Sequence, residues 1–233
     1  GGVSLDGDAA FMGFGDKGTP YLIVNTADHA IHEPVDMGYG TESLEPTELM
    51  GHPGNTGSNY VMLRFKVPHD GWYSSLSRFR DLNIGGDYTT RGAEAIVSIN
   101  GQLQTKSIVS LEEWYDGTTG MFDVQTPVRY MKAGETFEFT IGPNGFYGFD
   151  ATGIKATIRE EDEGMFFDAG SALEANIQNA YTNPCGDVAN GTWSYYRANS
   201  PTNPSLALLL GKNTRDSGTV GFMDAVSLFP FIV

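Results

Sequence analysis

Residues 60–67 read YVMLRFKV, and this stretch decides the fold. Its odd positions, from 61 to 67, are all apolar, whereas Met62, Arg64 and Lys66 stand between them. Strict alternation is the period of a β-strand that buries one face and wets the other. The stretch therefore predicts a strand at the surface of an antiparallel sheet, with Met62, Arg64 and Lys66 on the solvent side.

Similar signals continue along the chain and predict about seven strands between residues 59 and 159. Residues 136–141 alternate as strictly as the first stretch, with Glu138 and Thr140 on the outer face. Asn100-Gly101 is the strongest two-residue hairpin signal known. The predicted strands are 60–67, 72–80, 92–100, 102–109, 128–131, 136–141 and 154–159. They indicate an all-β fold, an antiparallel jelly-roll β-sandwich with long loop insertions.

The flanks are less regular, and we expect them to complete one domain over residues 1–233. In this interpretation the core strands occupy 59–160, and segments 1–58 and 165–233 complete or decorate the sheets. Residues 36–56 are rich in Gly, Pro and Glu and predict a long loop. The remaining predictions are a helix over 169–180 and strands at 21–24, 192–197, 206–210 and 220–229.

The charge and the apolar pattern exclude several classes of partner. The chain holds 29 Asp and Glu against 14 Lys and Arg, a net charge of −15. Binding to a phosphate backbone needs the reverse balance, so we expect no nucleic-acid partner. No apolar run approaches the roughly 20 residues of a membrane span, so we expect no membrane insertion. Because the chain begins at Gly1 without a methionine, we expect a processed or trimmed chain.

No motif of the sequence predicts catalysis. His29, His32 and Glu33 lack the spacing of the zinc-hydrolase helix motif, in which two histidines lie four residues apart, and predict a surface loop. The Gly-x-Ser-x-Gly turn of serine hydrolases does not occur. The single cysteine, Cys185, rules out an intramolecular disulfide. We therefore expect a protein that is not an enzyme.

Several turn-rich stretches between residues 50 and 160 resemble stretches of a known module. The matching stretches are 64–68 with 71–73, then 97–101, and then 133–137, 142–145 and 150–153. In this order they resemble a jelly-roll β-sandwich module of secreted and surface bacterial proteins, which is similar to carbohydrate-binding modules. The resemblance implies an extracellular, non-catalytic protein that binds glycans, and it implies no catalytic residue.

Aromatic residues in turns are the candidate ligand contacts. Trp114, Tyr115 and Asp116 lie among Glu, Asp and Gly residues, and Tyr147 lies in a second Gly-rich turn. Sugars present apolar C–H faces that stack on such rings, while acidic side chains hold their hydroxyls. Large aromatics usually belong to the core, and we expect Trp72 and Trp193 to be buried there.

Three acidic residues in or near Gly-rich turns are candidate metal ligands: Asp81, Asp87 and Asp150. Ca²⁺ takes carboxylate and carbonyl oxygens from loops, so a structural calcium ion is the one cofactor that we expect. A solvated carboxylate is the alternative at each position.

Two functions remain open from the sequence. The first is a secreted carbohydrate-binding or adhesion module, whose partner is a glycan. The alternative is a self-assembling structural subunit of a surface layer, filament or capsid-like shell, whose partners are other copies of the chain. The apolar run 225–233 motivates this alternative, because exposed apolar strands pair with neighbours.

Overall fold

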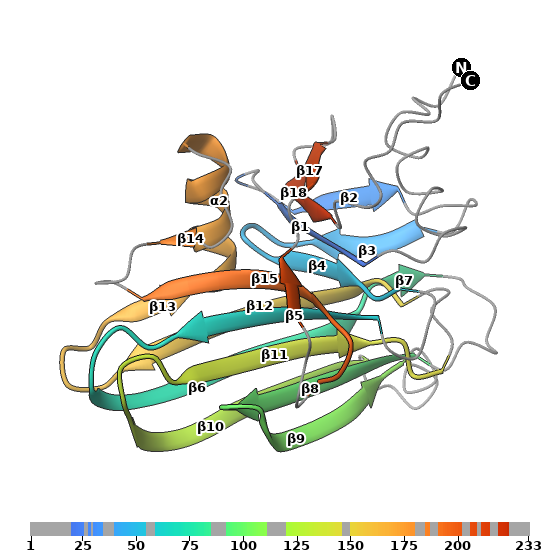
Figure 1. Cartoon of the computed structure of the whole chain (residues 1–233). Helices are drawn as coiled ribbons and strands as arrows, with labels where there is room; N and C mark the ends of the chain where they lie inside the picture. The colour runs from blue at the N-terminus through green and yellow to red at the C-terminus, as the bar shows by residue number, and fades with distance from the viewer. Residues whose placement is uncertain are drawn as a thin grey trace.

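Two large antiparallel sheets make up the computed structural model of the chain (Figure 1). The structure describes residues 20–25, 28, 30–34, 40–54, 59–84, 92–110, 120–145, 150–179, 185–186, 191–201, 206–208, 211–214 and 219–223. All strand pairs in the described part are antiparallel. The predicted fold class, an all-β antiparallel sandwich of the jelly-roll kind, is confirmed.

Each sheet brings together strands that are far apart in the sequence. In order, the eight-stranded sheet holds β10 (Met121–Met131), β6 (Gly71–Asp81), β12 (Thr152–Glu160), β4 (Leu49–His52), β1 (Tyr21–Asn25), β18 (Thr219–Met223) and β17 (Gly211–Thr214), with β13 (Phe166–Asp168) paired to β12. The seven-stranded sheet holds β14 (Cys185–Gly186), β15 (Thr192–Ala198), β5 (Tyr60–Lys66), β11 (Thr136–Gly142), β8 (Ala93–Ile99) and β9 (Gln102–Val109), with β16 (Leu206–Leu208) paired to β15. A third, small sheet holds β2 (Ile31–Pro34), β3 (Gly40–Leu44) and β7 (Asn83–Ile84).

The core fills the space between the two large sheets with the inward residues of each strand. Phe65 of β5 and Trp193 of β15 have ring centroids 5.2 Å apart, and Phe139 of β11 lies 6.0 Å from Trp193. Trp193 is buried, as predicted. Phe79 of β6 and Ile154 of β12 face them from the eight-stranded sheet and are fully buried. Burial of apolar surface on this scale is the main force that holds the two sheets together.

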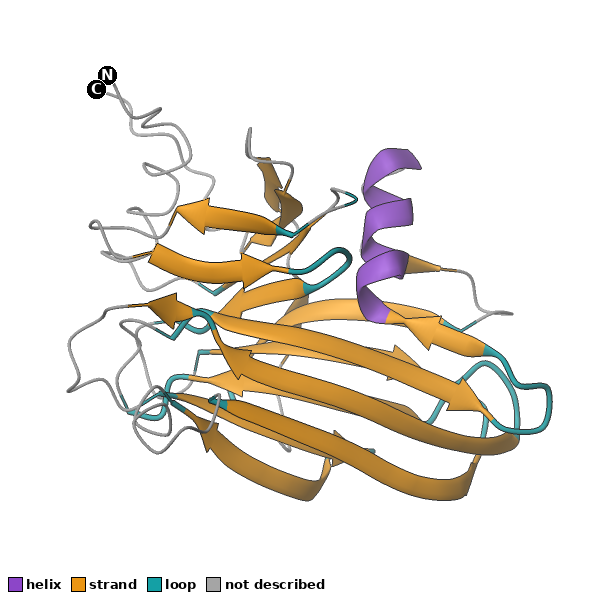
Figure 2. Ribbon diagram, turned by 180° about the vertical axis from the view of Figure 1, so that it is seen from behind, coloured by secondary structure: helices purple, strands orange, loops and turns teal. Residues whose placement is uncertain are grey.

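The helix α2 (Ala169–Asn179) confirms the predicted helix near residue 169 and runs roughly across the strand direction (Figure 2). The Asp168 carboxylate caps it, because Oδ1 accepts a hydrogen bond of 2.8 Å from the Ser171 backbone N–H. Ala169 and Leu173 anchor the first turns in the core. The Tyr195 hydroxyl donates a hydrogen bond of 2.7 Å to the Ala169 carbonyl, which ties the helix to β15.

The Asn100-Gly101 hairpin is confirmed between β8 and β9. Asn100 has φ 52° and Gly101 has φ 71°, so both central residues lie in the left-handed region. That pair of angles is the signature of the type I′ turn, whose twist matches the twist of the two strands that it joins.

Three predictions about the elements were wrong. Strand β10 begins at Met121 instead of residue 128, and its first part was missed because Asp123 and Gln125 face outward and a bulge breaks the alternation. Residues 36–56, predicted as one loop, contain β3 and β4: β3 pairs with β2 and β7, and β4 pairs with β1 and β12. His32 and Glu33, predicted in a surface loop, lie on β2.

The outer face of the seven-stranded sheet is also more buried than its alternation predicts. Met62, Glu138 and Thr140, expected on the solvent side, are all buried. The Ser98 hydroxyl on this face donates to the Glu138 carboxylate and reaches the Pro201 carbonyl at 3.4 Å. The segment that follows β15 therefore lies over this face. The sequences of β5 and β11 contain no local pattern that could predict this cover.

Candidate functional site

Two aromatic side chains that contact each other lie exposed on the outer face of the eight-stranded sheet. Trp72 of β6 is 47% exposed and Tyr130 of β10 is 51% exposed. Their ring centroids lie 5.6 Å apart with an interplanar angle of 74°, an edge-to-face pair. Such pairs hold both rings in place while part of each ring remains open to solvent.

A β-bulge brings Tyr130 to this face. The register of β10 against β6 shifts between Thr126 and Arg129, so Pro127 and Val128 fall in the irregularity. Before the shift the even-numbered residues of β10 face the core, as the buried Thr126 does; after it, Tyr130 lies opposite Trp72. Bulges commonly redirect side chains in this way, and proline is tolerated there because β10 is an edge strand.

Polar groups surround the aromatic pair. The Tyr130 hydroxyl lies 3.4 Å from Oδ2 of Asp70, whose Oδ1 accepts a hydrogen bond of 2.8 Å from the Ala133 N–H. On the opposite side of Trp72, the Ser74 hydroxyl donates a hydrogen bond of 2.6 Å to Glu161. Stacking rings therefore lie beside carboxylates that can accept hydrogen bonds from hydroxyl groups.

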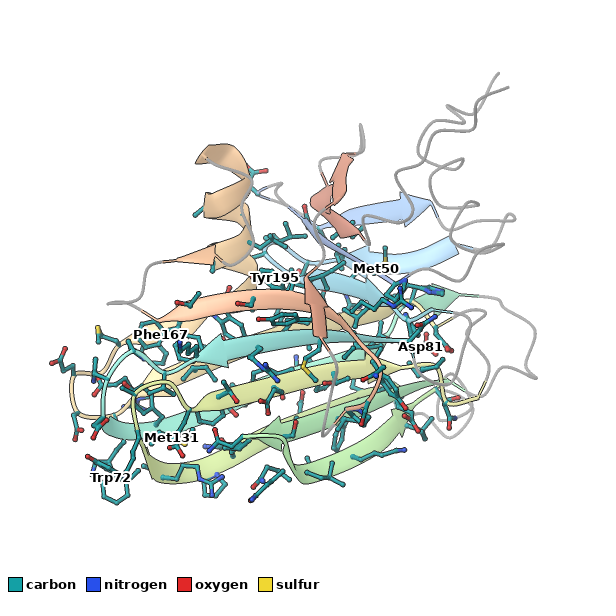
Figure 3. The ribbon with its side chains drawn as sticks, viewed as in Figure 1. Met50, Trp72, Asp81, Met131, Phe167 and Tyr195 are labelled. Atoms are coloured by element: carbon teal, nitrogen blue, oxygen red, sulfur yellow. The ribbon has the colours of Figure 1, made fainter. Side chains whose placement is uncertain are left out.

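A pair of acidic residues lies at the other end of β6, which Figure 3 shows by the positions of Trp72 and Asp81. Asp81 ends β6 and Asp150 precedes β12, and they are only 8% and 1% exposed. Because Thr152 pairs with Asp81 in the sheet, Asp150 is brought to the same edge. The structure thus unites two of the three predicted metal ligands.

The Asp150 carboxylate has an unusual environment. In the described part of the chain, neither of its oxygens has a hydrogen-bond partner. Burial, and next the negative charge of Asp81, raise the pKa of Asp150 to about 9. An unpaired carboxylate in such a place resists ionisation unless a positive charge is supplied.

The remaining predicted residues, Trp114, Tyr115, Asp116, Tyr147 and Asp87, lie outside the described residues. The described ends of their segments can still be placed. Gly120, which follows the segment with Trp114, accepts a hydrogen bond of 3.0 Å from the Asp81 N–H. Asp150 directly follows the segment that holds Tyr147. The anchors of these predicted contacts therefore meet beside the acidic pair.

Sequence reasoning missed the aromatic pair. The prediction that Trp72 is buried was wrong, because it rested on residue size alone. The available signal was the alternation of β6. Trp72 is an even-numbered residue, and it shares its strand face with the charged residues Arg78 and Arg80, which mark the solvent side. No such signal exists for Tyr130, because the bulge changes which residues of β10 face outward: even-numbered residues face the core before it and the solvent after it.

Comparisons with known proteins add structural neighbours of low similarity. No protein-family model and no curated protein matches the sequence. The PA14 sugar-binding domain from an RTX adhesin aligns with a TM-score of 0.28 and 12% identity, over 55% of this chain and 54% of that domain, so the chain spans about half of its length. A family 35 carbohydrate binding module from an environmental isolate aligns with 0.30 and 16%, over 64% and 96%. The PA14 domain of the MpAFP antifreeze protein aligns with 0.29 and 11%, over 65% and 86%.

The class of the chain follows from its own strand pairing: it is a jelly-roll β-sandwich. Among the described residues, no helix is long and apolar enough to cross a membrane. The same residues contain no group of three or more His, Cys, Asp or Glu side chains that could hold a metal ion. Among these residues, the acidic pair is limited to the two carboxylates of Asp81 and Asp150.

Proposed function

We propose that the chain is a non-catalytic carbohydrate-binding module that acts outside the cell, and that the glycan binds at Trp72 and Tyr130. The observation that carries this proposal is the half-exposed aromatic pair on a rigid sheet face. Large rings left open to water lose the free energy that burial would give them, so their exposure favours a ligand that covers them.

The surroundings of the pair suit a sugar better than a purely apolar ligand. A pyranose ring has an apolar C–H face and a rim of hydroxyl groups. The rings can take the apolar face, and the carboxylates of Asp70 and Glu161 can accept hydrogen bonds from hydroxyls. Arg159 lies 3.2 Å from the Glu161 carboxylate and can donate to a sugar oxygen at the same edge. Sites that combine an apolar wall with a few placed polar groups are typical of small-ligand recognition.

The test is a glycan array with the wild-type protein, followed by calorimetric titration of the best ligand. We expect Trp72→Ala to weaken binding by roughly 30-fold, the loss of about 2 kcal/mol that truncation of a central aromatic contact causes. Tyr130→Ala should show a similar loss. Leu76→Ala is the matched control, because Leu76 is 60% exposed on the same strand face and offers no ring.

Two outcomes would overturn the proposal. If the wild-type protein binds no glycan on the array, the proposed glycan-binding function is refuted. If Trp72→Ala binds with unchanged affinity, the proposed binding surface is refuted. Trp114→Ala belongs in the same series, because it decides between this surface and the site predicted from the sequence. Loss of binding only in Trp114→Ala would move the site to the residues predicted from the sequence.

Self-assembly stays the alternative. The apolar run 225–233 that motivated it lies outside the described residues. A measurement of mass in solution over a range of concentrations separates the two functions, since a module that binds glycans as a single copy keeps one mass. Defined oligomers that dissociate on Trp72→Ala would assign the aromatic pair to a protein interface instead.

A further inference from the structure

The acidic pair at the far end of β6 points to a site that the glycan proposal does not use. Asp81 and Asp150 come from different strands and are both buried. Along a strand that rises about 3.3 Å per residue, this end of β6 lies roughly 30 Å from Trp72. The two sites are therefore physically separate.

Two buried carboxylates beside each other need a positive charge. The cost of burying an ionised carboxylate without a partner is large, and a second one nearby adds repulsion. Among the described residues neither carboxylate oxygen of Asp150 has a hydrogen-bond partner. The neighbouring cation on β6, Arg80, is bound in two places by Glu48.

Backbone carbonyls belong to the chain segments that adjoin the acidic pair. The Gly120 carbonyl accepts from the Asp81 N–H, and the Ala151 carbonyl accepts from the Leu82 N–H at 2.9 Å. A Cβ placed on Gly120 would lie 3.1 Å from the Ser110 carbonyl oxygen and 3.4 Å from Asp81 Cβ. The ends of β6 and β9 and the starts of β10 and β12 thus meet at this end of the sandwich, and each carbonyl oxygen there has a second lone pair to offer.

We propose that Asp81 and Asp150 bind Ca²⁺ and that the ion fastens this end of the sandwich. Ca²⁺ takes six to eight oxygen ligands in irregular arrangements of carboxylates, carbonyls and water, whereas Mg²⁺ demands a regular octahedron. A site with only oxygen donors from four chain segments fits Ca²⁺. Zn²⁺ prefers nitrogen and sulfur donors, and no described His or Cys joins a metal-binding group here.

The experiment measures Ca²⁺ binding directly, by equilibrium dialysis, and thermal unfolding with CaCl2 or with a chelator. Extracellular calcium sites bind with Kd values on the order of 10⁻⁴ M, so about 10 mM CaCl2 is near 100 Kd. For a chain of this size we expect the ion to raise Tm by about 5 to 10 °C. The same concentration of MgCl2 should give a much smaller shift.

Asp150→Asn is the decisive variant. Because the Asp150 carboxylate oxygens have no hydrogen-bond partner among the described residues, the amide removes the charge without breaking a described side-chain hydrogen bond. We expect it to fold, to bind no Ca²⁺ and to show no calcium shift of Tm. Asp81→Asn should lose the shift as well, and Asp162→Asn, an exposed acid in the turn after β12, should keep it.

The result that would overturn the proposal is equally plain. A wild-type Tm that ignores CaCl2, together with no Ca²⁺ retained on dialysis, would show that the pair does not bind the ion. A rise of Tm in Asp150→Asn without any calcium effect in the wild type would show that the pair holds a proton instead. Neither result depends on whether the chain binds a glycan.

Discussion

We expect Glu48→Gln to cost about 3 kcal/mol of the free energy of unfolding, because it breaks an ion pair that is almost dry. Arg80 donates to Glu48 through Nε at 2.7 Å and through Nη2 at 2.5 Å. The two side chains are only 12% and 2% exposed. Removal of one partner from a buried pair costs about 3 to 5 kcal/mol, since the other charge is left without compensation. Gln keeps one acceptor oxygen, which favours the lower end.

Strand β6 carries its own control two residues away. Arg78 binds Asp123 with nearly the same geometry, Nε at 2.7 Å and Nη2 at 2.9 Å. Here both side chains are about half exposed, at 52% and 53%. Exposed pairs contribute about 0.2 to 1 kcal/mol, because water and salt screen them. Asp123→Asn should therefore cost about 0.5 kcal/mol.

The assay is thermal and urea unfolding of the wild type and both variants, at low salt and at about 1 M NaCl. For a chain of this size we expect a Tm lower by about 6 to 12 °C for Glu48→Gln and by about 1 to 2 °C for Asp123→Asn. High salt should erase the second effect and leave most of the first, because screening acts on solvated charges. Equal losses in the two variants, or a Glu48→Gln loss that salt abolishes, would refute the assignment of the difference to burial.

Two further predictions concern a buried histidine and a tight glycine. Burial lowers the pKa of His52 to about 4, and its Nδ1 lies 2.7 Å from the Pro53 carbonyl. Between pH 6.5 and 4, His52 binds a proton in the unfolded chain but stays neutral in the folded chain. The free energy of unfolding should therefore fall by about 3 kcal/mol as the pH drops through this window. Urea unfolding at several pH values checks this, and a His52→Gln variant with a profile parallel to the wild type would contradict it. Gly191→Ala should cost about 2 kcal/mol or more, because the residue has φ +82° and its Cβ would lie 2.4 Å from the Phe65 ring. Gly164→Ala, with φ +71° and nothing within 4 Å, should cost only about 1 kcal/mol, and calorimetric Tm values that rank the two variants in the opposite order would refute the steric reasoning.

The sequence predicted the strands that alternate and the turn that needs positive φ. Val61, Phe137 and Ile154 lie on buried faces where the alternation placed them. The hairpin at Asn100 formed as expected because its conformational preference is local. These features are properties of a few neighbouring residues, so a short window of sequence contains their cause.

The features that escaped prediction depend on distant contacts. Glu138 lies under a segment that follows β15, and its burial cannot be inferred from β11 alone. Between residues 36 and 56, β4 is held by β1 and β12 and β3 is held by β2 and β7, and of these partners β7 and β12 lie far away in the chain. For the acidic pair, the sequence identified Asp81 and Asp150 as candidates but could not show that the sheet would unite them.

The bulge at Pro127 and Val128 connects the fold of β10 to its surface chemistry. Without it, Tyr130 would continue the inward row of Val124 and Thr126 and would pack in the core. With the bulge, Met131 is the residue that packs in the core, and Tyr130 lies beside Trp72 on the outer face. Because both rings are half exposed, truncation of either should change the free energy of unfolding far less than a core aromatic would, where the cost is about 3 to 5 kcal/mol. A residue pair whose removal spares stability and abolishes binding is what a recognition surface requires, and the Tm of Trp72→Ala, measured beside its glycan affinity, separates that case from a structural role.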